Sequence, residues 1–273
     1  MSRAFRHVPA GRALHWWAEG WRAFRRAPLA WLGLSVALVL MVAVLGVLPL
    51  GPLLVKWLLP PLFAFGAVFA ASLQQRWRGA PRDLPAELIA EVTNDGAFDE
   101  SARLWRARIK PLLLASILVV LLGGVFGIAF VALAATLLGV GLAGVGALGA
   151  LAGSAGLLAG AGAMAGAMAT LTLLGLVALV VVSVAFWFVG TLVTLGGADA
   201  WEAIVLSLRA ALANVGALAL FSLLLLPAAM LVLATMGLGV LVLLPVLSAA
   251  SYASFDDVFG AAEARPRTEP NSL

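Results

Sequence analysis

Long, uninterrupted apolar segments dominate the hydrophobic pattern of this chain. Each is about twenty residues long or longer, and about twenty residues is the length at which a helix crosses the roughly 30 Å hydrocarbon core of a bilayer. The segments lie at 29–48, 53–73, 112–138, 168–194, 214–234 and 238–255. Strands of a membrane barrel would instead alternate lipid-facing apolar residues with polar ones. The pattern therefore predicts an all-α integral membrane protein with six transmembrane helices.

Short connections arrange these segments as three hairpins. The first two are separated by the turn 49–52, which contains two prolines, and the last two by the glycine-containing turn 235–239. The middle pair is separated by 139–167, which is rich in Gly and Ala and contains small-xxx-small spacings that let helices approach closely. We expect 139–167 to be a non-spanning linker or to extend the neighbouring helices. The alternative, an additional span, would move every later basic residue across the membrane.

The distribution of basic residues predicts the orientation. All but one of the 17 Lys and Arg precede the first span, lie in the loop 74–110, or follow the fourth or the sixth span. The connections 49–52, 139–167 and 235–239 carry no charge. Because basic residues accumulate in cytoplasmic loops, both termini are expected in the cytoplasm. The exception, Lys56, lies near the outer end of the second span, where its long side chain can reach the interface.

A segment with an apolar stripe and a polar opposite face precedes each hairpin. In the first, residues 1–28, the stripe opposes several arginines, and Pro28 ends the segment where the span begins. We expect a helix in the headgroup plane there, with tryptophan at the interface and arginine near anionic lipid headgroups. The simplest role is an anchor that fixes tilt, and a regulated lipid-binding role is the alternative. The candidate lipid contacts are Trp17, Trp21, Arg22, Arg25 and Arg26, and the stripe itself comprises Leu14, Trp17, Trp21 and Phe24.

The other two segments repeat this pattern. The second stripe contains Phe98, Ala102, Trp105 and Ile109, and the third contains Trp201, Ile204, Leu208 and Leu212. Asp199 and Glu202 have the spacing of a capping box at the start of the third segment.

Two polar regions complete the cytoplasmic side. The loop 74–110 is the candidate surface for a soluble partner, and its nearly balanced charge favours no partner class. Within it we expect a short helix from Asp83 to Val92, followed by a turn at Asp95–Gly96. The tail 256–273 is expected to be disordered.

The residues that carry most enzyme chemistry are missing. There is no cysteine, and the only histidines, His7 and His15, precede the first span. The glycines of 139–144 match a dinucleotide-binding spacing without the strand that this motif requires, and Ser154 lacks a nearby base. The net charge of +4 lies beside the spans, which argues against nucleic-acid binding. We therefore expect a non-enzymatic protein with no catalytic, cofactor or metal site.

Prolines and hydroxyl groups inside the spans suggest an alternative function. A channel or permease for a small uncharged or amphipathic solute could use kinked helices and a polar seam. The candidate prolines are Pro60, Pro61, Pro227 and Pro245, and the candidate hydroxyl residues are Ser183, Thr191, Ser222 and Ser248.

Two end motifs resemble a known family. The entry motif runs from Gly20 through Trp21, Phe24 and Pro28 to Trp31, and the exit motif runs from Tyr252-Ala-Ser to Asp257-Val-Phe259. Both resemble a family of uncharacterised six-helix proteobacterial inner-membrane proteins. The chain more distantly resembles the membrane domains of glycerophosphodiester phosphodiesterases, without the metal-binding residues of the hydrolase. The resemblance implies six helices in a bacterial inner membrane. The expected function is a scaffold or accessory protein that contacts anionic lipid. The sequence names no protein partner, and it is compatible with a homo-oligomer.

Overall fold

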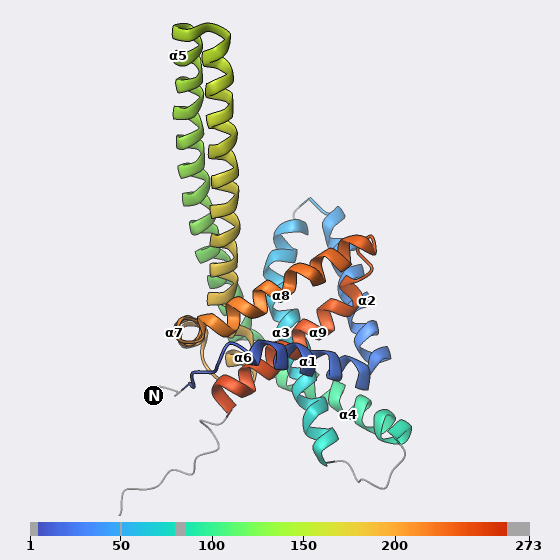
Figure 1. Ribbon diagram of the computed structural model, residues 1–273. Coiled ribbons are helices and arrows are strands. Elements are labelled where there is room, and N and C mark those ends of the chain that lie inside the picture. The colour runs from blue at the N-terminus through green and yellow to red at the C-terminus, as the bar shows by residue number, and fades with distance from the viewer. Residues whose placement is uncertain (1–4, 50, 80–85, 261–273) are drawn as a thin grey trace, which may run out of the picture. The chain divides into compact units, whose positions relative to one another are not determined.

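The chain is helical throughout the part that the structure describes. The computed structural model describes residues 5–49, 51–79 and 86–260, with side chains described except at 52–53, 56–57, 76–79, 86–95 and 179–180 (Figure 1). Every regular element in these ranges is a helix, which confirms the all-α prediction. The elements are α1 (Arg12–Arg26), α2 (Pro28–Val47), α3 (Gly51–Gly79), α4 (Ala86–Ala107), α5 (Ile109–Ala185), α6 (Val189–Thr194), α7 (Ala200–Ala213), α8 (Val215–Ala234), α9 (Val240–Phe255) and the π-helical turn η1 (Asp256–Gly260).

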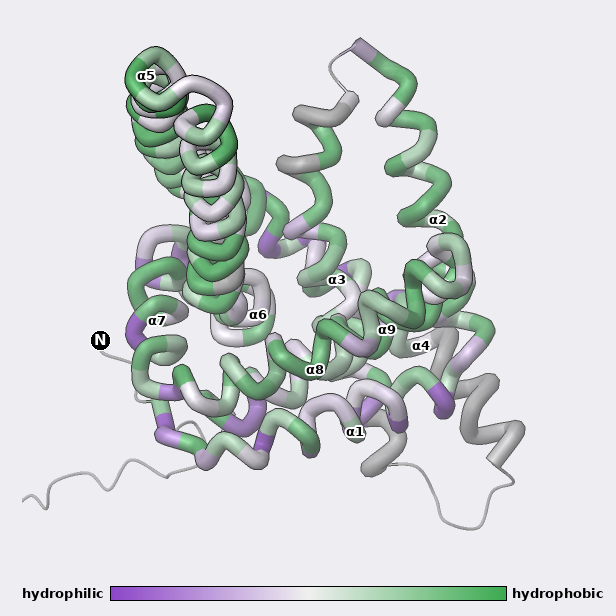
Figure 2. Tube along the Cα trace, turned by 45° about the horizontal axis from the view of Figure 1, so that its top comes forward, coloured by the Kyte–Doolittle hydropathy of each residue, from purple (hydrophilic) through white to green (hydrophobic). Residues whose placement is uncertain are grey.

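Among the residues that the structure describes, five helical segments are long and apolar enough to cross a membrane. They are Pro28–Val47, Leu58–Gln75, Ile109–Thr194, Val215–Ala234 and Val240–Gly260. Hydrophobic residues run along the whole of α2 and α8, whereas hydrophilic residues gather on α1 and α7 (Figure 2). The chain is therefore a multi-pass membrane protein.

The helix α5 is itself a hairpin of two antiparallel arms. Its backbone leaves the helical conformation at Gly153, where φ is 60° and ψ is −140°. The arms pack closely through glycine: a Cβ added at Gly160 would lie 3.0 Å from the Cα of Val145, and one added at Gly175 would lie 2.9 Å from the ring of Phe130. The 139–167 stretch is thus helical on both sides of the reversal and extends the two apolar segments. The arm before Gly153 has 44 residues and the arm after it has 32, so at 1.5 Å per residue they are about 66 Å and about 48 Å long, and both exceed the roughly 30 Å hydrocarbon core.

The conformation of Gly153 predicts how the hairpin responds to substitution. Only glycine adopts this combination of φ and ψ without strain, so Gly153→Val should cost about 1–3 kcal/mol at the reversal. Because the chain has no cysteine, Val145→Cys and Gly160→Cys provide a clean disulfide reporter of the hairpin. We expect Gly153→Val to slow this cross-link about tenfold. The matched control is Gly162→Val, a glycine with no neighbour within 4 Å of an added Cβ. Equal cross-linking rates in the two variants would contradict the prediction.

The chain forms two compact units, and α9 is the centre of the larger one. One unit is the α5 hairpin from Val119 to Ser183, and the other comprises the chain before and after it. In the larger unit α1, α2, α3 and α8 all contact α9. Small residues permit these crossings: Gly66 of α3 lies against the Ser248 side chain, 2.7 Å from an added Cβ to its Oγ, and Gly20 of α1 lies against the Val246 backbone carbonyl. Small residues at crossings are typical of helices packed in a membrane.

The segment expected as one span from 168 to 194 is broken. Helix α5 ends at Ala185 and the buried helix α6 begins at Val189. Ser207 of α7 satisfies the backbone at the break, because its Oγ accepts from the Phe188 N–H at 3.1 Å and donates to the Ala185 carbonyl at 2.7 Å. The apolar sequence continues through the break, so hydrophobicity alone cannot reveal it.

Two further predictions, in α4 and after α9, are corrected. Helix α4 continues through Asp95–Gly96, so the expected turn is wrong, and an interior glycine costs a helix only about 1 kcal/mol. Residues 256–260 do not begin a disordered tail, because they form η1 with Val258 and Phe259 buried. The remainder of the expected tail and residues 83–85 lie outside the described residues.

Candidate functional site

Helix α1 has an apolar buried face and an exposed face that carries both large apolar residues and arginines. Ala13, Trp16 and Gly20 are buried, and Trp16 lies 6.2 Å from the Phe221 ring of α8. On the exposed face, Leu14 is 57% exposed and Trp21 is 45% exposed. Large apolar side chains left uncovered by protein favour contact with lipid or another apolar surface.

The stripe predicted for lipid divides between these two faces. Leu14 and Trp21 are exposed as expected, whereas Phe24 packs against the buried cluster around Trp31. Trp17 stacks on Phe221 at 5.3 Å, and its enclosed indole nitrogen has no hydrogen-bond partner among the described side chains. Trp17 therefore contributes mainly to the contact between α1 and α8.

The buried face of α1 was missed at the sequence level. Its signal is the spacing of Ala13, Trp16, Gly20 and Ala27, which places small residues and one tryptophan on one side of the helix. The apolar stripe opposite the arginines is the stronger pattern in the sequence, and the prediction followed that stripe instead.

The candidate arginines lie at the exposed end of α1. Arg22 pairs with Glu19 at 2.8 Å, and Arg25 and Arg26 are exposed in the last turn. Basic residues in a last turn also interact favourably with the helix dipole. These arginines and Trp21 form one surface, which we call the α1 headgroup surface (Trp21, Arg22, Arg25 and Arg26).

Helices α4 and α7 repeat the arrangement of α1. Helix α7 buries Ala203, Ser207 and Ala210 and exposes Trp201 and Leu212. Helix α4 buries Ala97 and Ser101 and exposes Phe98 and Leu104, and Ser101 also donates to the Ser72 hydroxyl of α3 at 3.2 Å. Arg103 of α4 and Arg209 of α7 are exposed as well. In each helix small residues face the protein, together with Trp16 in α1 and with Ile204 and Leu206 in α7, so Ile204 does not belong to an exposed stripe as predicted. Other large apolar residues and arginine are exposed in each helix.

The cap of α7 follows the sequence prediction. The Asp199 side chain accepts a hydrogen bond from the Glu202 N–H at 2.8 Å and so satisfies a free donor of the first turn.

A polar cluster ties the start of the chain to the end of α9. The Asp257 carboxylate accepts from Arg12 Nε at 2.6 Å and Nη2 at 2.5 Å, and from Trp16 Nε1 at 2.8 Å. Arg6 Nη2 donates to the Asp257 carbonyl at 2.8 Å. The hydrogen bond to Asp257 raises the pKa of the Arg12 guanidinium above its ordinary value, so Arg12 is charged at all physiological pH values.

Asn214, between α7 and α8, holds the same N-terminal segment. Its Oδ1 accepts from the Val8 N–H at 2.7 Å, and its Nδ2 donates to the carbonyls of Arg6 at 3.0 Å and Ala210 at 2.9 Å. Asn214 is fully buried, and its side-chain oxygen and nitrogen both form hydrogen bonds. The cluster and Asn214 are thus structural, and they hold α1 where its arginines are exposed.

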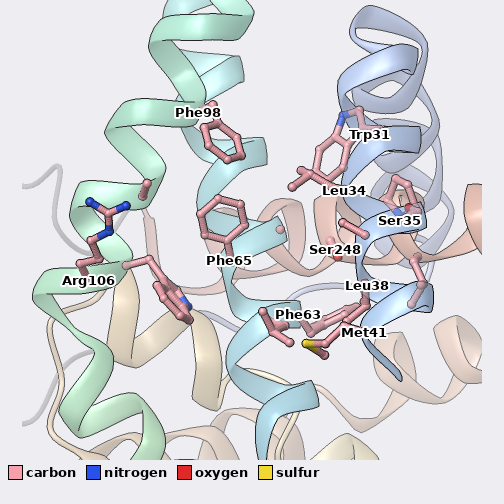
Figure 3. Close-up of a pocket in the computed structure, with 17 residues that line it drawn as sticks. Trp31, Leu34, Ser35, Leu38, Met41, Phe63, Phe65, Phe98, Arg106 and Ser248 are labelled. Atoms are coloured by element: carbon pink, nitrogen blue, oxygen red, sulfur yellow. The ribbon is translucent and has the colours of Figure 1, made fainter. Parts of the chain in front are cut away.

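A groove of about 360 Å³ lies among α2, α3, α4 and α9. Most of its wall is apolar, with Leu34 and Leu38 on α2, Phe65 on α3 and Phe98 on α4 (Figure 3). Its polar side chains are Ser35, Ser248 and Arg106. Arg106 lies on the α4 side, and the two serines lie beyond Phe65 toward α2 and α9 (Figure 3).

The structure does not gather the proposed hydroxyl seam in one place. Ser248 and Pro245 line the groove, but Ser222 and Thr191 do not. Thr191 instead donates to the Phe188 carbonyl at 3.0 Å within the buried helix α6. Ser183 belongs to the α5 unit, and the side chain of Lys56 lies outside the described residues.

The chain was compared with protein-family models, with curated proteins and with solved structures, and none of them matches it.

Proposed function

We propose that the protein is a non-enzymatic scaffold or accessory protein of a bacterial inner membrane, whose cytoplasmic helices contact anionic lipid headgroups. The shared architecture of α1, α4 and α7 carries this proposal. Each helix uses small residues against the protein and leaves aromatic or aliphatic residues and arginine exposed. This composition suits the interface, where apolar side chains enter the acyl boundary and arginine meets phosphate.

The proposal includes six spans with both termini in the cytoplasm. Two arms of α5 added to α2, α3, α8 and α9 make six apolar helices, and the basic residues fall on one side of them. Reporter fusions after residues 50, 90, 153, 205, 237 and 265 test this arrangement. We expect periplasmic activity after 50, 153 and 237 and cytoplasmic activity after 90, 205 and 265. A periplasm-active reporter after 265 would overturn the orientation and the headgroup contact together.

The α1 headgroup surface supports a measurable preference for anionic lipid. A basic residue near an anionic surface contributes about 1 kcal/mol, so the three arginines contribute up to about 3 kcal/mol, and the Glu19 pair reduces the share of Arg22. The preference appears as a larger rise in melting temperature with phosphatidylglycerol than with phosphatidylcholine, because lipid that binds the native state stabilises it.

Replacing Arg22, Arg25 and Arg26 by glutamine should remove about half or more of this phosphatidylglycerol-specific stabilisation in the full-length protein. The matched control replaces the same residues by lysine, which keeps the charge and should keep most of the effect. If the glutamine and lysine variants respond alike to phosphatidylglycerol, charge at α1 does not recruit anionic lipid.

The alternative of a permease receives less support from the geometry. A polar path requires the hydroxyl groups of several helices to meet, and only one of the four candidates, Ser248, lines the groove. Solute flux into proteoliposomes no faster than into empty liposomes is the expected result.

A further inference from the structure

The surface of helix α7 is divided into three sectors. One sector packs against the protein. The second is apolar and exposed: Trp201, Leu208 and Leu212 are 63%, 43% and 69% exposed, and their spacing places them on one side of the helix. We call these three residues the α7 stripe. The third sector carries Glu202 and Arg209, about a quarter turn from the stripe. A helix with separate buried, apolar and charged sectors fits the boundary where protein, lipid and water meet.

A bend at Asn214 turns α7 away from the direction of α8. The backbone of Asn214 has φ −118° and ψ 27°, and α7 and α8 run in clearly different directions in Figure 2. Helix α8 is long and apolar enough to cross a membrane, so a helix that meets its end at a large angle lies along the membrane surface. Val215, the first residue of α8, is also 61% exposed. Exposed apolar side chains therefore continue from α7 into a membrane-spanning helix.

The charge of α7 does not favour anionic lipid. Arg209 is the one basic residue of this helix, whereas Glu202 and the capping Asp199 are acidic. Basic residues are attracted to an anionic membrane surface, and acidic residues are repelled by it. Helix α7 thus lacks the arginine cluster that the α1 headgroup surface has. The free energy of its contact with a membrane comes from burial of the α7 stripe, which does not depend on headgroup charge.

From these features we infer that α7 inserts its stripe between lipid headgroups and recognises loosely packed bilayer, whatever the headgroup charge. The large side chains of the stripe fill gaps between headgroups. Such gaps are more frequent where headgroups are small or the membrane is curved, and binding by amphipathic helices of this kind is sensitive to lipid composition and curvature. The inference rests on the proposed interfacial location of α7. It assigns to α7 a different membrane property, lipid packing, from the anionic charge that α1 contacts.

Quenching of a site-specific label in the full-length protein tests the insertion. Because the chain has no cysteine, Leu212→Cys and Arg209→Cys each provide one site for an environment-sensitive fluorophore, the first in the stripe and the second in the charged sector. In vesicles of neutral phosphatidylcholine with brominated acyl chains, we expect the label at 212 to be quenched at least about threefold more than the label at 209. Equal quenching would overturn the inference. A near-complete disulfide between the 212 positions of two unlabelled copies would also overturn it, because protein would then cover the stripe.

Lipid composition separates packing from charge. With the brominated fraction held constant, half of the remaining phosphatidylcholine is replaced by phosphatidylethanolamine, which is neutral and has a smaller headgroup. We expect quenching at 212 to rise about twofold, because the gaps between headgroups become more frequent. Replacing the same share by phosphatidylglycerol adds charge and should leave the quenching unchanged. A larger rise with phosphatidylglycerol than with phosphatidylethanolamine would show that charge drives the contact.

Neighbouring substitutions test whether the stripe inserts as a unit. Trp201→Ser removes the aromatic anchor of the stripe and should lower the quenching at 212 by about half. Glu202→Gln is the matched control, since it changes the next residue in the charged sector and should leave the quenching as it was. If both variants are quenched alike, Trp201 does not anchor α7 and the stripe does not act as proposed.

The anionic contact of α1 and the insertion of α7 can fail separately. The variant in which Arg22, Arg25 and Arg26 are replaced by glutamine should keep full quenching at 212 in neutral lipid. Stabilisation by phosphatidylglycerol without quenching at 212 would refute the insertion of α7 alone. Quenching at 212 without that stabilisation would refute the anionic contact alone.

Discussion

The variant Gly20→Leu is expected to detach α1 from α9 and to lower the melting temperature of the protein in mild detergent by about 10 °C. An added Cβ at Gly20 would overlap the backbone carbonyl oxygen of Val246, which cannot move aside as a flexible side chain could. Overpacking costs about 1–3 kcal/mol, and a displaced α1 would also withdraw Trp16 from its fully buried site. At roughly 2–4 °C per kcal/mol for a chain of this size, the combined loss gives the stated shift.

The matched control is Gly33→Leu. Gly33 is an exposed position of α2 where an added Cβ meets nothing within 4 Å. Leucine is the better helix former by somewhat less than 1 kcal/mol, so this variant should melt at or slightly above the temperature of the unaltered protein. If both glycine variants melt together, the close approach of α1 and α9 does not stabilise the fold.

The second large effect is expected for Asp257→Asn. This change leaves the Arg12 guanidinium without its counter-charge, although the amide oxygen can still accept from Trp16. Breaking a fully buried pair costs about 3–5 kcal/mol. The side chains of Arg12 and Asp257 are 36% and 17% exposed, so water screens part of this loss. We expect Asp257→Asn to lower the free energy of unfolding by about 2 kcal/mol, which a lower melting temperature would report.

Asp256→Asn is the control for this experiment, since Asp256 is exposed and, within the described structure, carries no ion pair. It should change the melting temperature little. The variant Arg12→Gln should destabilise the unaltered protein but have little further effect in the Asp257→Asn background, as a double-mutant cycle requires of residues that act together. Additive losses would mean that the two residues stabilise the protein independently.

The sequence revealed the features that depend on neighbouring residues. The end of α1 and the start of α2 follow from Pro28, whose ring suits a first helical position. The cap of α7 follows from Asp199 and Glu202, which are three residues apart. The reversal near 153 was not located, because a stretch with many glycines offers many possible turns and only the packing of the arms selects one.

In the candidate site, too, the sequence predicted some features and only the packing of the helices decided others. The exposure of Trp21, Arg22 and Arg25 agrees with the amphipathic pattern, but the burial of Trp17 against Phe221 does not follow from it. The two tryptophans lie four residues apart on one face of α1, and a helix elsewhere in the chain covers one of them only. The groove was invisible in the sequence for a similar reason, since its walls come from four helices.

By itself the sequence determined that the chain lies in lipid and that it is helical there. Continuous apolar segments require lipid, and in lipid the backbone must satisfy its own hydrogen bonds, so helices follow from composition and length alone. Only the tertiary structure decided which face of α1 is buried, where the fourth apolar segment breaks, and that η1 is ordered by the pairing of Asp257 with Arg12. These features depend on contacts between residues far apart in the chain, and no local pattern of hydrophobicity encodes which distant partner a residue will meet.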